Sequence, residues 1–268
     1  MNKTIALMTI HKWRSNYFLL LALLIFFLFE IVKTGTISVF YPESLDFDEI
    51  TNTGAVFPFL LALGTGIIGG ETQSGTITLT LSHAVRRCDY VLTKWLTLSF
   101  TAFLLSLLQL AIQFAFVIYR DATLYTASDM LSFVIWRLLL SLAFGAVMIF
   151  FSSVKSGNFA GTGVWVIFLL ISGLFSSLAS LGKINPKDLP NEPFFHFLQH
   201  AAERVSGFCS LVYRPIERFL VPDPTFFNFQ DLPDVKWYLI AAFFFVMFLQ
   251  LTVSIWILDR KELSYATD

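Results

Sequence analysis

The sequence predicts an all-α, polytopic membrane protein, and three observations carry that prediction. Of the 268 residues, 56% are hydrophobic and only 14% are charged, whereas soluble domains usually carry about 25% charged residues. Apolar runs of roughly 20 residues, the length of a membrane-crossing helix, recur along the whole chain. The runs lack the alternation of barrel strands, and in lipid only helices or closed barrels satisfy every backbone polar group. The net charge of −1 gives no sign of nucleic-acid binding.

Six apolar runs are predicted to be transmembrane helices: 16–39, 52–70, 95–119, 131–151, 159–181 and 236–258. The first run contains Glu30 and Lys33. A tilted helix, or an outer half that faces protein, would accommodate both charges. Residues 1–268 are therefore expected to form a single transmembrane domain.

The distribution of charge predicts the orientation. With the N-terminus inside, the basic residues of the cytoplasmic segments are Lys3, Lys12, Arg14, Arg86, Arg87, Lys94, Lys155, Arg260 and Lys261. The short loop between the first two runs is acidic instead, with Glu43, Asp46, Asp48 and Glu49. Because cytoplasmic loops carry the excess of lysine and arginine, both termini are predicted to be cytoplasmic. We expect a multi-pass protein of the cell inner (plasma) membrane. The first run is too long for a cleavable signal peptide and has no small-residue cleavage site after it.

Residues 1–15 precede the first run and are predicted to form an amphipathic helix in the membrane interface. A helix over residues 3–15 places Ile5, Met8 and Trp13 on one side and the basic residues elsewhere. The alternative is that these residues are only a basic segment next to the membrane, as the excess of lysine and arginine in cytoplasmic segments predicts.

Residues 182–235 form the largest predicted external segment. It begins and ends with prolines, and its middle is a helical-looking run, 194–219, that is rich in phenylalanine. That run is too apolar for a free loop. We expect the segment to pack on the membrane domain or to enter the outer leaflet as a re-entrant element.

Neither a disulfide nor a metal site is predicted. Cys88 is expected inside and Cys209 outside, so they cannot pair within one chain. His196, His200 and Glu203 share one helical face, but the glutamate of a His-Glu-x-x-His motif is replaced by phenylalanine at position 197. No catalytic residue and no cofactor are expected on this chain.

The most informative polar segment is 71–94, between the second and third runs. Gly69 and Gly70 are predicted to end the preceding helix, and Ser74-Gly75-Thr76 offers a second break and a cap. The apolar positions that follow are Ile77, Leu79, Leu81 and Val85. The basic positions are Arg86, Arg87 and Lys94. A short helix along the cytoplasmic membrane surface fits this pattern, and the alternative is a solvated turn with ordinary positive-inside residues.

This segment resembles the signature of the type-2 ABC-transporter permeases, the membrane subunits of an exporter class. The resemblance implies ATPase-coupling roles for Glu71, Gly75, Thr76, Leu79, Leu81, Arg86, Arg87 and Lys94. The chain departs from the family pattern at Ala84, where a proline is usual, and at Arg86, where a serine is usual. In outline the resemblance extends over the whole chain, including the amphipathic start and the long segment before the last run.

The resemblance implies a permease domain with a separate motor. Two permease chains, either copies or paralogues, would pair in the lipid bilayer, and each would bind a cytosolic ABC ATPase that holds ATP and Mg²⁺. The coupling helix would lie between Gly75 and Cys88. The sequence agrees, since no Gly-x-x-x-x-Gly-Lys-Ser/Thr phosphate loop occurs in it. The alternative is an ion-coupled secondary transporter or a membrane-embedded enzyme that acts alone. The scarcity of acidic residues in the middle of the runs argues against such a carrier.

Four polar residues within the runs are candidates for a translocation path or for pairing inside the membrane: Glu30, Gln109, Gln113 and Arg137. Ionisable groups inside a membrane span are functional candidates by default. For Glu30 and Arg137 the simpler alternative is that the side chain snorkels to the outer interface. For the two glutamines it is hydrogen bonding between helices.

Overall fold

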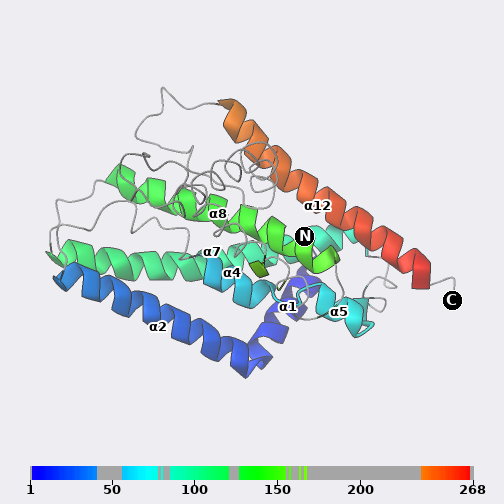
Figure 1. Cartoon of the computed structure of the whole chain (residues 1–268), viewed down its shortest axis with the longest axis horizontal. Helices are drawn as coiled ribbons and strands as arrows, with labels where there is room; N and C mark the ends of the chain where they lie inside the picture. Colours follow the sequence, from blue (N-terminus) through cyan, green and yellow to red (C-terminus); the bar gives the residue numbers. More distant parts are fainter. Residues whose placement is uncertain are drawn as a thin grey trace, which may run out of the picture. The chain divides into compact units, whose positions relative to one another are not determined.

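The computed structural model describes residues 2–40, 56–77, 80, 85–120, 127–154, 157, 163, 166–167 and 237–265. Every regular element within these ranges is a helix (Figure 1), which confirms the predicted all-α class. The chain divides into two compact units, Met1–Thr162 with Asp223–Asp268 and Gly163–Pro222. Nearly all described residues belong to the first unit. The predicted external segment 182–235 lies outside the described residues, as does most of the predicted fifth run.

The chain begins with two helices that meet at an elbow. Helix α1 covers Lys3–Ser15, and α2 covers Tyr17–Phe40. The axes of Lys3–Ser15 and Tyr17–Phe29 differ by 79°. The side chain of Asn2 caps α1 by accepting a hydrogen bond from the Thr4 amide.

The buried face of α1 differs from the predicted one. The side chains that α1 buries are Ile5, Ala6, Thr9 and Trp13. Met8 was predicted on this face, but it is 55% exposed. The reason is that the buried arc extends from the Ile5, Thr9 and Trp13 row toward Ala6 and away from Met8.

Three long helices form the core of the first unit: α7 over Arg87–Arg120, α8 over Ala127–Val154 and α12 over Trp237–Tyr265. Each contains a stretch that is long and apolar enough to cross a membrane, and the bent pair of α1 and α2 would make a fourth such element within the described residues. Six spans therefore stay a prediction. Helix α7 is roughly 50 Å long at 1.5 Å per residue, which exceeds the approximately 30 Å of bilayer hydrocarbon, so it must extend beyond the apolar layer.

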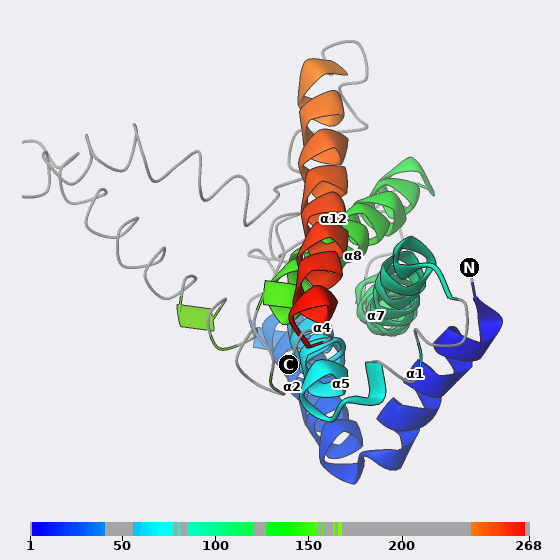
Figure 2. The ribbon, with the colours of Figure 1, turned by 90° about the vertical axis from the view of Figure 1, so that its right-hand side faces the viewer.

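Helix α7 is the central element of this unit. It contacts α1, α2, α4, α8 and α12, as Figure 2 shows for the helices around it. Small residues permit its close approach to α8, since a Cβ atom added at Gly145 would overlap Ser99 Oγ. Trp95 Nε1 also donates a hydrogen bond to the Leu142 carbonyl, at 2.8 Å. These contacts fix α7 and α8 as one packed pair.

The predicted second run, 52–70, is not one helix. Helix α4 covers only Phe57–Gly64, and a separate short helix, α5, covers Gly69–Gln73. The prediction that Gly69 and Gly70 end a helix is therefore wrong, because they begin α5. The left-handed glycine at this break is Gly66, with φ 67°.

Candidate functional site

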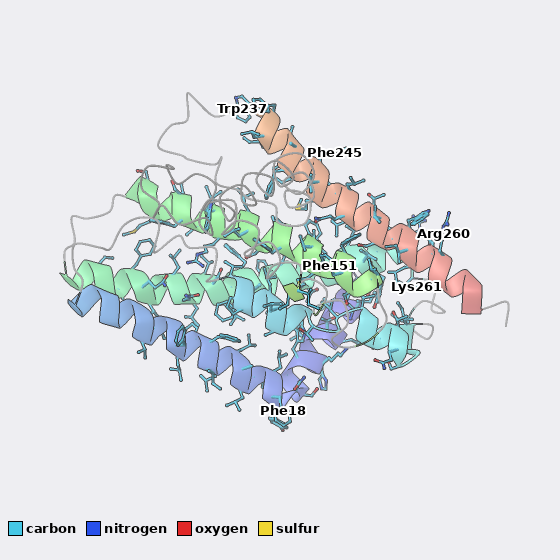
Figure 3. The ribbon with its side chains drawn as sticks, in the orientation of Figure 1. Phe18, Phe151, Trp237, Phe245, Arg260 and Lys261 are labelled. Atoms are coloured by element: carbon cyan, nitrogen blue, oxygen red, sulfur yellow. The ribbon has the colours of Figure 1, made fainter. Side chains whose placement is uncertain are left out.

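Six charged side chains in the described part of the first unit lie at one end of its helices, which we call the polar end. It is formed by Lys12, Glu71, Arg87, Lys94, Asp259 and Lys261. The end of α12 contributes to it, and Figure 3 shows Arg260 and Lys261 there, with Trp237 at the opposite end of the same helix. The helix starts and ends that meet here leave backbone groups that need partners.

Glu71 and Lys94 form a buried ion pair between α5 and α7. Lys94 Nζ lies 2.5 Å from Glu71 Oε1, and the lysine side chain is only 2% exposed. Tyr90, one helical turn before Lys94, donates its hydroxyl to Glu71 Oε2 at 2.5 Å. The lysine ammonium also lies 5.6 Å from the centre of the Tyr90 ring. A buried charge is tolerated only when it is paired, and here one carboxylate serves two donors.

At the break between α4 and α5, side chains from two other helices form hydrogen bonds with backbone groups. Trp13 Nε1 of α1 donates to the Leu63 carbonyl at 3.0 Å, and Lys12 Nζ lies 3.5 Å from the Gly66 carbonyl. On the other side of the break, Ser152 Oγ of α8 accepts from the amides of Ile68 and Gly69, at 3.1 and 3.0 Å. The carbonyls of Leu63 and Gly66 and the amides of Ile68 and Gly69 therefore have partners, as buried backbone groups require.

Helix α12 is held to α7 and α8 at the polar end. Arg87 Nε lies 3.0 Å from Asp259 Oδ1, in a pair whose side chains are 41% and 46% exposed. Lys261 Nζ donates to the last carbonyls of α8, at 2.8 Å to Ser153 and 2.9 Å to Val154. A cation at the C-terminus of a helix also interacts favourably with the helix dipole.

The segment after α5 presents a polar, exposed surface. Gly75 ends α5 in the left-handed conformation, with φ 70°. A helical turn follows, in which Thr80 Oγ1 donates to the Thr76 carbonyl at 3.0 Å. The exposed side chains next to this turn are Gln73, Ser74, Thr76, Arg86 and Cys88. Ile77 is buried, while Leu79, Leu81 and Ala84 lie outside the described residues.

The structure divides the predicted coupling residues into two groups. Thr76 and Arg86 are exposed. Glu71 and Lys94 instead pair with each other, and Arg87 pairs with Asp259. The third run was predicted to begin at residue 95, but α7 begins at Arg87 and Lys94 lies in its second turn. Helix α7 begins earlier than predicted because Tyr90 and Lys94 both bond to Glu71. These bonds hold the polar first two turns of the helix within the packed unit.

The polar residues inside the long helices are buried. Gln109 and Gln113 of α7 and Arg137 of α8 are each no more than 5% exposed. Snorkelling to the outer interface is therefore the wrong interpretation for Arg137, because protein encloses its side chain. Gln250 of α12 is also fully buried, and the sequence analysis missed it. Its signal in the sequence is a polar side chain within the apolar run 236–258. The side chain of Glu30 lies outside the described residues.

Within the described ranges, no group of three or more His, Cys, Asp or Glu side chains is arranged to hold a metal ion. His196, His200 and Glu203 lie outside those ranges.

Comparison with protein families identifies the chain. The family described as ABC-2 family transporter protein matches residues 37–263, which is most of the sequence. No curated protein matches the chain. The family match confirms the resemblance drawn from the 71–94 segment, and it accords with the apolar helices that are long enough to cross a membrane. The chain therefore belongs to the ABC-2 transporter family and is the membrane component of an ABC transporter.

Proposed function

We propose that the chain is the permease subunit of an ATP-driven exporter. It pairs with a second permease copy or paralogue, and each permease binds a separate cytosolic ABC ATPase that carries ATP and Mg²⁺. Hydrolysis on that ATPase is coupled to movement of a substrate across the membrane. Both termini and the polar end face the cytosol in this proposal. Family membership supports it over the alternative of an ion-coupled carrier or an enzyme that acts alone.

The observation that supports this proposal is the set of ion pairs and hydrogen bonds that connect the helices at the polar end. Helix α5 is attached to α7 through Glu71 and Lys94, and to α8 through Ser152. Helix α12 is attached to the same two helices by Arg87–Asp259 and by Lys261. A force applied to the segment after α5 would therefore reach three long helices through short, specific contacts.

The segment from Gln73 to Arg86 is the proposed docking surface for the ATPase. Insertion of Leu79 and Leu81 into an apolar groove would supply most of the affinity, because burial of a leucine side chain contributes about 1.5–3 kcal/mol. Arg86 would add an exposed pair worth about 0–1 kcal/mol. Glu71 and Lys94 have a different role in this proposal, since they hold the segment against α7. The ATP-bound and ATP-free forms of the ATPase would bind the inward- and outward-facing permease with different affinity. That difference in affinity drives the permease from one state to the other.

Co-purification tests this function. The tagged chain, solubilised from its own membranes in mild detergent, is expected to retain a second protein. Mass spectrometry of its peptides should identify that protein as an ATPase whose sequence contains a phosphate loop. The double variant Leu79→Asp/Leu81→Asp should lose that subunit. The matched variant Leu79→Met/Leu81→Met keeps the apolar character and should retain it.

Two results would count against the proposal. An ATPase retained at the wild-type ratio by the aspartate variant would overturn the assignment of the docking surface. A chain that is purified without any ATPase and still moves its substrate would overturn the function itself.

A further inference from the structure

A cavity of about 270 Å³ lies at the elbow between α1 and α2. Its polar wall includes Lys12 and Lys94, and its apolar wall includes Trp13, Leu19, Ala22 and Ala62. Phe18 also borders it, and Figure 3 shows this residue at the turn where the two helices meet. The cavity is a different surface from the proposed ATPase docking segment.

The charges around this cavity favour an anion. Lys12 and Lys94 both line it. Glu71 compensates the charge of Lys94. No carboxylate in the described part of the chain pairs with Lys12, whose side chain is exposed. The cavity therefore retains one accessible positive charge, and a negatively charged group beside Lys12 would offset it.

The apolar wall and the position of the cavity favour an anion that carries a hydrocarbon chain. Lys12, near the end of α1, lines the cavity and is exposed, and the following helix, α2, exposes apolar side chains such as Phe18, which is 87% exposed. The 79° elbow places the cavity where a helix with a polar face gives way to an apolar one. In a bilayer, such a change from polar to apolar surface fits the level at which the headgroups meet their acyl chains. A free inorganic anion would leave the apolar wall uncovered, and a zwitterionic lipid would bring its own cationic group with its phosphate and so would offset the charge of Lys12 less.

We propose that this cavity binds an anionic phospholipid of the surrounding membrane. The phosphate of its headgroup lies against the ammonium of Lys12, which can donate to phosphate oxygens. The first part of one acyl chain lies along Leu19, Ala22 and Ala62. The lipid thereby joins α1, α2 and α4 at the place where Lys12 and Trp13 already satisfy the carbonyls of the helix break.

Native mass spectrometry of the purified full-length chain tests the proposal directly. In a neutral detergent, the chain is titrated with dioleoylphosphatidylglycerol, and separately with dioleoylphosphatidylcholine. The anionic lipid should occupy one tight site, and Lys12→Gln should weaken its binding at least fivefold. Arg14→Gln removes the same charge from the same helix at an exposed position that does not line the cavity. It should change the affinity less than twofold.

A second pair of variants tests the apolar wall. Ala22→Phe fills the cavity and should weaken binding of the anionic lipid to a similar extent. Leu21→Phe adds bulk to the neighbouring position, which is exposed and does not line the cavity, and it should leave binding unchanged.

Four results would overturn the proposal. Equal losses for Lys12→Gln and Arg14→Gln would mean diffuse attraction to basic residues, and equal affinities for the two lipids would exclude a preference for a lipid of net negative charge. Displacement of the lipid by millimolar inorganic phosphate would indicate a site for free phosphate. Unchanged binding to Ala22→Phe would place the lipid outside the cavity.

Discussion

Lys94 reaches Glu71 from the second turn of α7, at 2.5 Å between Nζ and Oε1, and the two side chains are only 2% and 16% exposed. At the same end of the unit, Arg87 and Asp259 form a second pair that remains exposed. The two pairs have the same chemistry and different surroundings. Their contributions to stability should therefore differ, because removing one partner of a buried pair leaves an uncompensated buried charge.

Glu71→Gln should lower the free energy of unfolding of the detergent-solubilised chain by roughly 3–5 kcal/mol, because the Lys94 ammonium would stay buried without a counter-charge. Arg87→Gln should cost only about 0–1 kcal/mol, as exposed pairs do. The measurement is the denaturation midpoint followed by circular dichroism. Adding Lys94→Met to Glu71→Gln should restore most of the loss. Equal costs for the two single variants would show that burial does not distinguish the pairs.

Ser152→Ala should destabilise the break between α4 and α5 by about 1–3 kcal/mol, because the buried amides of Ile68 and Gly69 lose their acceptor. Hydrogen exchange should become faster at these two amides. Ser153→Ala is the matched control, since its hydroxyl donates to the Phe150 carbonyl of its own helix. Its removal leaves no buried amide without an acceptor, so it should cost less than Ser152→Ala. Similar exchange in both variants would contradict the capping role of Ser152.

Gly145→Ala should destabilise the α7–α8 pair by about 1–3 kcal/mol, because the new methyl group overlaps Ser99 Oγ and crowds Trp95. Ser99→Ala in the same chain should recover part of the loss. Gly163→Ala makes the identical change at a helical position where an added Cβ meets nothing within 4 Å, so it should be neutral or slightly stabilising. Thermal melting of the purified variants compares them, and a neutral Gly145→Ala would disprove the close contact.

Cys88 offers a test of orientation, because it is an exposed free thiol beside the proposed docking segment. In a Cys209→Ser background, a membrane-impermeant maleimide should label Cys88 in inside-out vesicles and leave it unlabelled in right-side-out vesicles. Lysing the right-side-out vesicles should restore labelling, which controls for reactivity. Labelling from the outside of intact vesicles would reverse the predicted topology.

Much of the helical framework was predictable because each element depends on its own apolar pattern. The predicted 3–15 helix and the predicted first and last runs correspond to α1, α2 and α12 within a few residues, except that α12 extends further at its C-terminus. The charge pattern of 71–94 was enough to suggest the family that the comparison then identified. In these cases the local sequence contains the information that determines the result.

The break at Gly64–Ile68 could not be predicted in the same way. The run remains apolar through it, and its two glycines could equally have been tolerated within a continuous helix. The partners that stabilise the break, Trp13 and Ser152, lie 50 and 84 residues away in sequence from Leu63 and Ile68. The early start of α7 depends on Glu71 in the same manner. Features that require two distant segments to meet are not visible in either segment alone.

Both halves of this interrupted helix pack against α8, but their facing ends are held by side chains of different helices, and this has a mechanical consequence. The end of α4 is attached to α1 through Trp13, whereas the start of α5 is attached to α8 through Ser152. An unbroken helix would turn as one rod and would carry any rotation along its full length. With the left-handed Gly66 between them, the two halves can instead change direction separately, so that a shift of α5 at the polar end need not turn α4.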